Sequence, residues 1–139
     1  CLIAHENHPI LKKAKKFAPT GKKISRIPQY VDLADAIPYE FFLSDYDTIL
    51  GREARHIFNR NGLQPITCNE SLTALMAAAG HGLAFTYYSS RHYFRDAKFL
   101  SLGADLASIK LATALPPGRY HSKAALALQE VLLKILSND

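Results

Sequence analysis

The sequence predicts an α/β fold with a largely parallel β-sheet, and residues 57–88 carry most of the evidence. A helical pattern ends at Asn61-Gly62, an extended segment follows at 65–68, and a short helix leads to a second extended segment at 83–88. Strand, helix and strand in this order form a crossover unit that joins parallel strands. Open sheets of this kind bind ligands at the carboxyl ends of their strands. We therefore expect a small-molecule site at that edge.

The first third of the chain alternates extended segments with turns. Residues 1–5 predict a strand that ends before Pro9, because proline cannot donate to a sheet and forces extended geometry on its predecessor. A basic loop follows around 17–21, and 31–35 predict one helical turn. The aromatic run at 39–43 has the composition of a buried strand.

The segment that follows predicts an amphipathic helix ending at Gly62. Its apolar side chains lie on one helical face: Leu50, Ala54, Ile57 and Phe58. Asp47 or Thr48 can cap its start, and Gly62 can adopt the left-handed conformation that ends it. A second, shorter helix is predicted between a cap at Ser71 and a stop at Gly80. Its apolar face is predicted to comprise Leu72, Leu75, Met76 and Ala79.

The rest of the chain predicts further strands and one long helix. A short helix is expected at 91–96 and strands at 99–102 and 109–114. Ser122 is positioned to cap a helix that runs to about residue 137. Its broad apolar face needs a partner surface and comprises Ala125, Leu128, Val131, Leu132, Ile135 and Leu136.

Composition excludes several classes of protein. The chain has 139 residues, the size of one domain, with 48% apolar and 21% charged residues. No apolar run approaches the roughly 20 residues that a membrane span needs. Two cysteines, Cys1 and Cys68, are too few for a disulfide scaffold, so we expect a reducing, cytoplasmic compartment.

Several motifs suggest chemistry but have simpler interpretations. The net charge of +5 comes mostly from lysines around the loop at 17–21, without any nucleic-acid-binding motif, which favours a solvated loop. His5 and His8 are three residues apart and precede Pro9, so we expect no metal site. Ser44 and Cys68 lack the sequence context of a catalytic nucleophile. We therefore expect no enzymatic activity and no cofactor.

Polar side chains follow three of the predicted strands. They are Ser44, Asp45 and Thr48, then Asn69, Ser71 and Thr73, then Tyr87, Tyr88 and Ser89. Helix N-termini at Thr48 and Ser71 would present backbone N–H groups and a positive dipole end, which suit a carboxylate ligand. These residues could instead serve simply as caps and turns. For the group as a whole, the ligand site is the favoured interpretation.

An ordered set of fragments carries a resemblance to a known family. They are His8-Pro-Ile-Leu11, Val31-Asp-Leu-Ala-Asp35, Arg52 to Pro65, Asn69-Glu-Ser71, Ala77 to Ala84 and Pro117 to Lys123. Together they resemble the effector-binding domain of LysR-type transcriptional regulators over nearly the whole chain. That domain has two α/β subdomains joined by crossing strands, like a type II periplasmic binding protein.

The resemblance implies a mixed, mostly parallel sheet flanked by helices, and a division of the chain. Residues 1–8 would be a crossing strand and hinge, 9–109 the second subdomain, and 110–139 the returning strand and C-terminal helix of an incomplete first subdomain. The chain lacks an initiator Met and opens inside an apparent strand, so we expect it to be part of a longer protein. The DNA-binding helix-turn-helix would lie in the missing N-terminal part.

The resemblance also implies site residues in a cleft between the subdomains. The effector-binding residues carried over are Ser44, Thr48, Ile49, Ser71 and Tyr87, and the hinge residues are Ala4 and Ala112. The family usually has proline after the strand at 83–88, whereas this chain has Tyr87-Tyr88 there.

The implied function is the sensing of a small, often carboxylic effector that controls DNA binding. The intact protein would be a cytoplasmic homodimer or homotetramer that contacts DNA through its N-terminal domain and no membrane. The alternative is a solute-binding lipoprotein of a transporter, which shares the fold and would carry its lipid on Cys1. Against this, the chain is apolar from Cys1 onward, where a lipoprotein has a polar tether.

Overall fold

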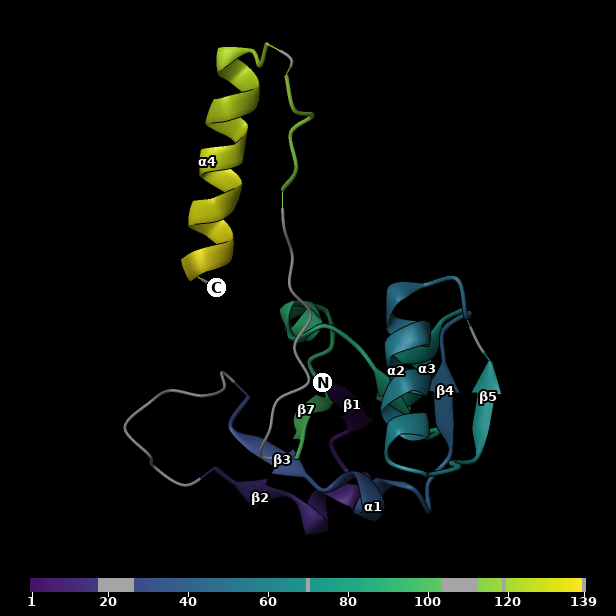
Figure 1. Ribbon diagram of the computed structural model, residues 1–139. Helices are drawn as coiled ribbons and strands as arrows, with labels where there is room; N and C mark the ends of the chain where they lie inside the picture. The colour runs from purple at the N-terminus through teal and green to yellow at the C-terminus, as the bar shows by residue number, and fades with distance from the viewer. Residues whose placement is uncertain (18–26, 70, 104–112, 119, 139) are drawn as a thin grey trace. The chain divides into compact units, whose positions relative to one another are not determined.

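The computed structural model describes residues 1–17, 27–69, 71–103, 113–118 and 120–138 (Figure 1). The chain divides into two compact units, residues 1–107 and 108–139, and each is described by itself.

The described part of the first unit holds seven strands, three α-helices and two 3-10 helices (η). Their order is β1 (Leu2–His5), η1 (Pro9–Lys13), β2 (Lys15–Lys16), β3 (Gln29–Val31), α1 (Leu33–Ala36), β4 (Phe41–Leu43), α2 (Ile49–Arg60), β5 (Thr67–Asn69), α3 (Thr73–Ala78), β6 (Leu83–Phe85), η2 (Tyr88–Tyr93) and β7 (Ala97–Leu102).

The strands form one mixed sheet in the order β2-β3-β7-β1-β6-β4-β5. Strand β4 is parallel to β5 and β6, and β3 is parallel to β7. Strand β1 is antiparallel to both β6 and β7, and β2 is antiparallel to β3. Five strands therefore share one direction, which confirms the predicted mixed, mostly parallel sheet.

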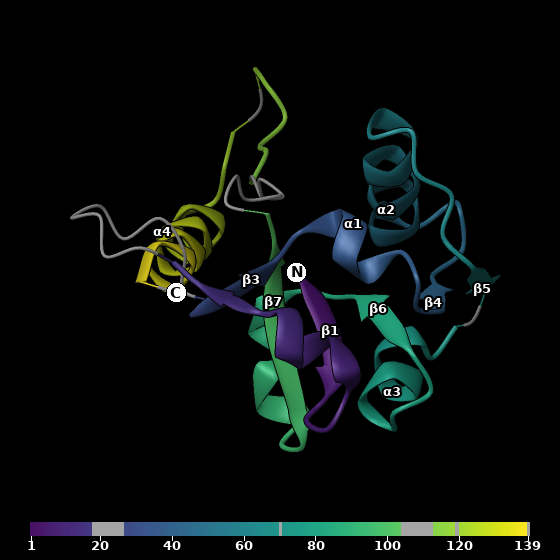
Figure 2. The same ribbon diagram turned by 90° about the horizontal axis from the view of Figure 1, so that it is seen from below.

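Helices cover both faces of the sheet, with α2 and α3 on opposite sides of β6 (Figure 2). The larger core lies on the α2 side, where Ala54 and Phe58 pack with residues from β1, β4 and β6. The smaller core lies on the α3 side, where Ala77 packs with Ile3 and Ala84. Two buried faces explain why the central strands are continuously apolar rather than alternating.

Strand β1 contributes to both cores. Leu2, Ile3 and Ala4 are fully buried; Leu2 and Ala4 belong to the larger core and Ile3 to the smaller one. Successive side chains of a strand point to opposite faces, so this short run fills both layers. The predicted strand at residues 1–5 is confirmed.

The short helix α3 differs from its prediction. It begins at Thr73 with Leu72 as its N-cap and no side-chain capping bond, so the prediction that Ser71 caps it is wrong. The predicted apolar face is wrong in part, because Leu72 and Leu75 are more than half exposed. Thr73 and Ala77 are buried instead, since small side chains let this helix pack closely on the sheet.

Other boundaries differ more modestly. The helical turn predicted at 31–35 lies two residues later, because Val31 belongs to strand β3. The helix expected at 91–96 is instead η2, which begins at Tyr88 and shortens the preceding strand. The strand expected at 109–114 lies almost wholly outside the described residues.

The described lysines beside the basic loop are exposed, as predicted. Lys13 Nζ lies 3.1 Å from the Asp35 carboxylate, and Lys15 forms an ion pair with Asp32. The Asp32 hydrogen bond and charge raise the pKa of Lys15 above its usual value. Exposed pairs of this kind contribute little to stability. Most of the predicted loop, residues 18–21, lies outside the described part.

The second unit contains α4 (Lys123–Asn138). Ser122 Oγ accepts a hydrogen bond from Ala125 N at 3.2 Å, which confirms the predicted cap. Gln129 Nε2 donates to Thr113 Oγ1 at 2.9 Å and ties the helix to the segment before it. The helix keeps many apolar side chains exposed: Leu126, Leu128, Val131, Leu132, Leu133 and Ile135. Within the described residues, no helix is both long and apolar enough to span a membrane.

Two histidines form the turn that leaves β1. His5 Nδ1 accepts from Asn7 N and His8 Nδ1 accepts from Ile10 N, each at 3.2 Å. The His8 ring meets Tyr39 edge-on at 4.9 Å. Burial first, and the neighbouring His5 second, lower the pKa of His8 below its usual 6.5. Protonated imidazole has no acceptor nitrogen, so these bonds require the neutral form.

We predict that acid weakens this turn. Because the folded-state pKa of His8 is depressed, its contribution is complete above pH 6.5 and is lost as the pH falls toward the folded value. His8→Asn keeps an acceptor but does not titrate, so its urea-unfolding midpoint should fall less between pH 7.5 and 5 than that of wild type. His56→Asn, at an exposed position on α2, is the control. Equal pH dependence in wild type and His8→Asn would contradict the prediction.

Three phenylalanines occupy the centre of the larger core. Phe41 lies 5.0 Å from Phe58 and 5.9 Å from Phe85 between ring centroids, and Phe58 lies 5.6 Å from Phe85. Phe41 is the largest fully buried side chain described. These contacts join β4, α2 and β6, the three elements that lead to the polar edge described below.

We predict that Phe41→Ala lowers the free energy of unfolding by about 3–5 kcal/mol, because it leaves a cavity among these rings. Urea unfolding measures the change. Tyr93→Ala, at a side chain 84% exposed, should change it by less than about 0.5 kcal/mol. Equal effects of the two substitutions would show that the ring cluster does not hold the core.

Candidate functional site

The candidate site is the edge of the sheet where β4 and β6 end. Parallel strands end at the same edge, so the segments 44–48 and 86–88 both lie there. Strand β1 is antiparallel to β6, so it begins at this edge, and Thr86 N donates to Cys1 O at 2.9 Å. The edge therefore gathers the predicted polar residues of two loops beside the start of β1.

Thr48 organises the loop between β4 and α2. Its Oγ1 accepts from Gly51 N at 2.9 Å and donates to Asp45 O at 2.7 Å, and its own N–H donates to Asp45 O at 3.0 Å. A hydroxyl group has only one hydrogen to donate, and Thr48 already donates it to the Asp45 carbonyl. Thr48 caps α2 as predicted, but in this arrangement its hydroxyl cannot also donate to a ligand.

Gly51 allows the loop to lie directly on α2. A Cβ at this position would be 2.1 Å from Asp45 O and 2.5 Å from Ser44 O. These are backbone atoms, so relief requires movement of the loop itself. The glycine near the start of this helix is thus explained by the close approach of two carbonyl groups.

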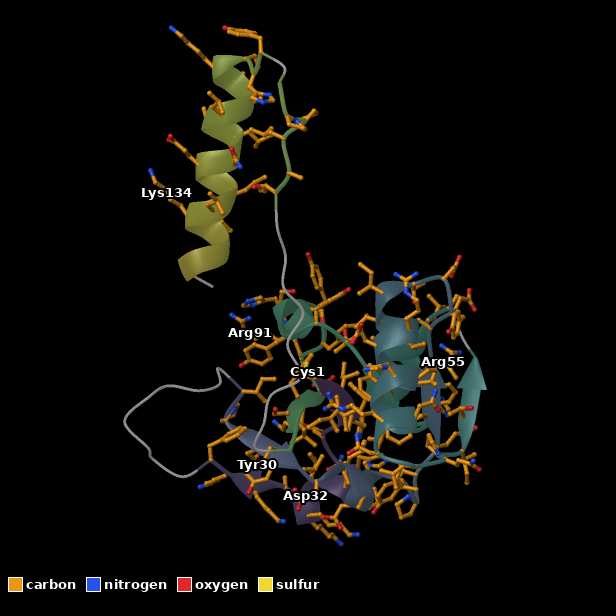
Figure 3. The ribbon with its side chains drawn as sticks, in the orientation of Figure 1. Cys1, Tyr30, Asp32, Arg55, Arg91 and Lys134 are labelled. Atoms are coloured by element: carbon orange, nitrogen blue, oxygen red, sulfur yellow. The ribbon has the colours of Figure 1, made fainter. Side chains whose placement is uncertain are left out.

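Arg55 ties the loop to the helix from one side (Figure 3). Its Nη1 donates to Ser44 O and to Gly51 O, each at 2.9 Å. Its guanidinium also lies over the Tyr46 ring, 5.6 Å from the centroid. A single half-buried side chain therefore contacts the loop at two residues and its own helix at a third.

A partly open cavity of about 370 Å³ lies between the loop, α2 and the start of β5. Its lining includes Tyr46 of the loop, Arg55 of α2, Pro65, and Thr67 of β5. Beside Tyr46 the loop therefore borders this cavity and is not packed against a continuous apolar surface. Tyr46 is 69% exposed.

The second loop begins at Thr86 and Tyr87. Thr86 is buried, and its Oγ1 lies 3.1 Å from Ser90 Oγ, which donates to Tyr87 O at 2.7 Å. Tyr87 is 40% exposed and has an extended backbone with φ of −84°, close to the range that proline adopts. The backbone at this position is therefore extended, although the residue is tyrosine and not the proline that the resemblance implies.

A cation–aromatic cluster follows in η2. The Arg91 guanidinium lies over the Tyr88 ring at 4.7 Å, and Tyr88 meets Phe99 of β7 edge-on at 5.9 Å. Arg91 Nη1 also approaches Tyr88 O at 3.4 Å. The two ion pairs found among the described residues lie elsewhere, in the first part of the chain. This cluster fixes η2 against the sheet.

The structure brings some of the predicted residues together. Ser44 and Thr48 share one loop, and Ile49 is the first residue of α2 and 49% exposed. Ser44 Oγ lies 3.5 Å from Thr73 Oγ1, which links the loop to α3. Tyr87 belongs to the neighbouring loop at the same edge.

The remaining predicted residues are placed differently. Ser71 is exposed in the turn before α3 and does not cap it. Ala4 is fully buried in β1, the strand predicted to cross between subdomains. Ala112 lies outside the described residues. The sequence interpretation missed Arg55 and Gly51; a glycine inside a helical pattern was an available signal for Gly51, whereas an arginine on the polar side of a helix carries none.

The edge offers hydrogen-bond donors rather than metal ligands. In the described part of the chain, the N–H groups of Ile49 and Leu50 have no acceptor, as is usual for a first helical turn. No cluster of His, Cys, Asp and Glu that could hold a metal occurs among the described residues. Helix N–H donors beside serine and tyrosine hydroxyls can bind a small anion or polar ligand.

Comparisons of the sequence with known protein families and with curated proteins give no match. Solved structures do match. The chain is similar to the effector-binding domain of QuiR in complex with shikimate, with a TM-score of 0.59 and 17% identity over 96% of this chain. It is similar to the CcmR regulatory domain of Synechocystis PCC6803 in complex with 2-PG, with a TM-score of 0.65 and 12% identity over 96%.

A third similar structure is the BenM effector-binding domain with its effector benzoate, with a TM-score of 0.57 and 17% identity over 99% of this chain. All three are effector-binding domains of LysR-type regulators. The matches confirm the predicted fold class, which is like that of type II periplasmic binding proteins. The chain spans about 60% of the length of these domains: 59%, 61% and 59%.

We predict that Gly51→Ala destabilises the domain. In an unhindered helix this change would stabilise by up to about 1 kcal/mol, because alanine has the higher helix propensity. Here the added Cβ displaces the carbonyl groups of Ser44 and Asp45, so we expect a loss of about 1–3 kcal/mol in the free energy of unfolding. Urea unfolding decides the sign, and stabilisation would contradict the close approach.

Proposed function

We propose that this chain is the sensing part of a LysR-type transcriptional regulator and binds a small, carboxylate-bearing effector at the carboxyl edge of its sheet. The observation that carries the proposal is the fold, which matches three ligand-bound effector domains over 96–99% of the chain. The ordered sequence fragments support the same family. Shikimate and benzoate, which two of those structures contain, are carboxylic acids.

The proposed site combines the two loops at this edge. Ile49 and the first turn of α2 supply N–H donors to the effector carboxylate, and Ser44 and Tyr87 contact the rest of the molecule. Thr48 acts chiefly through its cap, because its hydroxyl hydrogen is taken by Asp45. Ser71 is exposed in the turn before α3, and we propose that it contacts the effector at the margin of the site.

The proposed domain organisation follows the same likeness. In this proposal residues 1–8 are a crossing strand and hinge, 9–109 are the second subdomain, and 110–139 are the returning strand and C-terminal helix of an incomplete first subdomain, with Ala4 and Ala112 as hinges. The match to about 60% of each similar domain supports a missing first subdomain. The exposed apolar side chains of α4, such as Leu128 and Ile135, support its packing there.

The proposed mechanism is a shift between open and closed clefts. An effector that binds the closed cleft better moves the equilibrium toward it by its difference in affinity. In the intact protein, a cytoplasmic homodimer or homotetramer, this change alters how an N-terminal helix-turn-helix holds DNA. The chain has no catalytic role in this scheme. A solute-binding lipoprotein would share the fold, but the similar structures found are regulatory domains, which favours the regulator.

We predict that the intact gene product binds at least one of shikimate, benzoate and 2-PG, measured by isothermal titration calorimetry. Tyr87→Ala should weaken binding about tenfold or more, because an aromatic contact at the edge is lost. Tyr93→Ala removes the same ring from the other end of η2 and should leave the affinity unchanged. Equal affinities in the two variants would place the ligand elsewhere, and absence of binding by all three acids would count against the proposed effector class.

A further inference from the structure

We infer that Arg55 is a positioning residue of the effector site: it fixes the loop at residues 44–48 against α2 without touching the ligand. The expected effect on effector binding rests on the proposed function, whereas the role of Arg55 in holding residues 44–48 against α2 does not. It assigns a role to an arginine that the sequence presents as one more charged residue on a helical surface.

The geometry makes Arg55 a clamp between two carbonyl groups. A guanidinium Nη1 carries two hydrogens, and Nη1 of Arg55 has two acceptors at 2.9 Å, Ser44 O and Gly51 O. Ser44 directly follows β4, and Gly51 lies in the first turn of α2. One nitrogen atom therefore holds the residue after β4 and the first turn of α2 at a fixed separation. Bonds with a charged donor are stronger than neutral ones.

Apolar burial does not hold this loop. Asp45, Tyr46 and Asp47 are exposed, and the cavity of about 370 Å³ lies beneath Tyr46. The described bonds from Thr48 join the end of the loop to α2, where Gly51 N donates to Thr48 Oγ1 at 2.9 Å and Arg52 N to Thr48 O at 3.1 Å. The other described bonds between the loop and the rest of the domain are the long Ser44–Thr73 contact, a 3.5 Å bond from Arg52 to Asp47 O, and those of Arg55. Of these, Arg55 alone makes short bonds to both strand end and helix.

The Tyr46 ring adds to the clamp. The ring lies under the Arg55 guanidinium at 5.6 Å, a distance at which cation and aromatic face attract. A lysine at this position would place a compact ammonium there and could not present the same planar fork. We therefore expect the interaction to depend on the guanidinium and not on positive charge alone.

The proposed effector donors lie next to this clamp. Ser44 is the first residue of the loop, and Ile49 and Leu50 follow Thr48, its last residue. If the loop moves relative to α2, the Ser44 hydroxyl and the helix N–H groups no longer face the ligand together. Donors that are already ordered bind a ligand more tightly, because less conformational entropy is lost on binding. Loss of the Arg55 clamp should therefore weaken effector binding even though Arg55 itself makes no contact.

The test compares Arg55→Met with Arg60→Met in the intact gene product. Arg60 is the exposed last residue of the same helix and is far along the chain from the loop. Residue-resolved hydrogen exchange is followed at Thr48 N and Gly51 N, which the loop protects, and at Phe41 N and Leu83 N, which the sheet protects. We expect exchange at the two loop amides to rise about fivefold in Arg55→Met alone.

The sheet amides separate positioning from general stability. Unchanged loop exchange in Arg55→Met would overturn the inference. An equal rise at Phe41 and Leu83 would also overturn it, since Arg55 would then serve the whole fold. Arg55→Lys should restore only part of the protection, because the planar fork is lost; full restoration would show that charge alone suffices and contradict the clamp.

Calorimetry with shikimate, benzoate and 2-PG then tests the consequence. For any acid that wild type binds, Arg55→Met should raise the dissociation constant about fivefold and Arg60→Met should not. Faster loop exchange with unchanged affinity would support the clamp and contradict the proposed use of this loop in effector binding. If wild type binds none of the acids, the proposed effector class fails while the exchange data still decide the inference.

Discussion

The structure depends on the burial of β1 between β6 and β7. Leu2, Ile3 and Ala4 have no exposed surface, and they contribute to the cores on both faces of the sheet. This antiparallel strand also begins at the polar edge, where Cys1, the residue before it, exchanges backbone hydrogen bonds with Thr86. One short segment therefore couples the interior of the domain to the place where the proposed ligand binds.

The candidate site is defined by close backbone approach more than by available side chains. Gly51 admits two carbonyl groups against α2, Thr48 uses its hydroxyl within the loop, and Arg55 donates to carbonyls on both sides. What remains for a ligand is the N–H groups of the first helical turn with Ser44 and Tyr87. Such a set suits a small carboxylate, which needs several directed donors and little apolar enclosure.

The sequence predicted the elements with strong periodicity and missed those decided by tertiary packing. Helix α2 and its Thr48 cap were predictable because apolar spacing, cap and terminal glycine agree. Helix α3 was not, since its small residues pack inward while Leu72 and Leu75 remain exposed. The proposed site residues Ser44, Thr48 and Tyr87 could be named from the sequence because they are polar residues in the segments that follow predicted strands. Arg55 was missed because its acceptors are backbone carbonyls, which leave no trace in the sequence.

The most direct measurement is the hydrogen-exchange footprint of a bound carboxylate on the intact gene product. We expect the acid to slow exchange at residues 44–51 and 86–88 and in the proposed first subdomain, because the cleft closes from both sides. Protection confined to the cavity between α2 and β5 would contradict the account, because that cavity lies behind the loop and would make a different surface the ligand site.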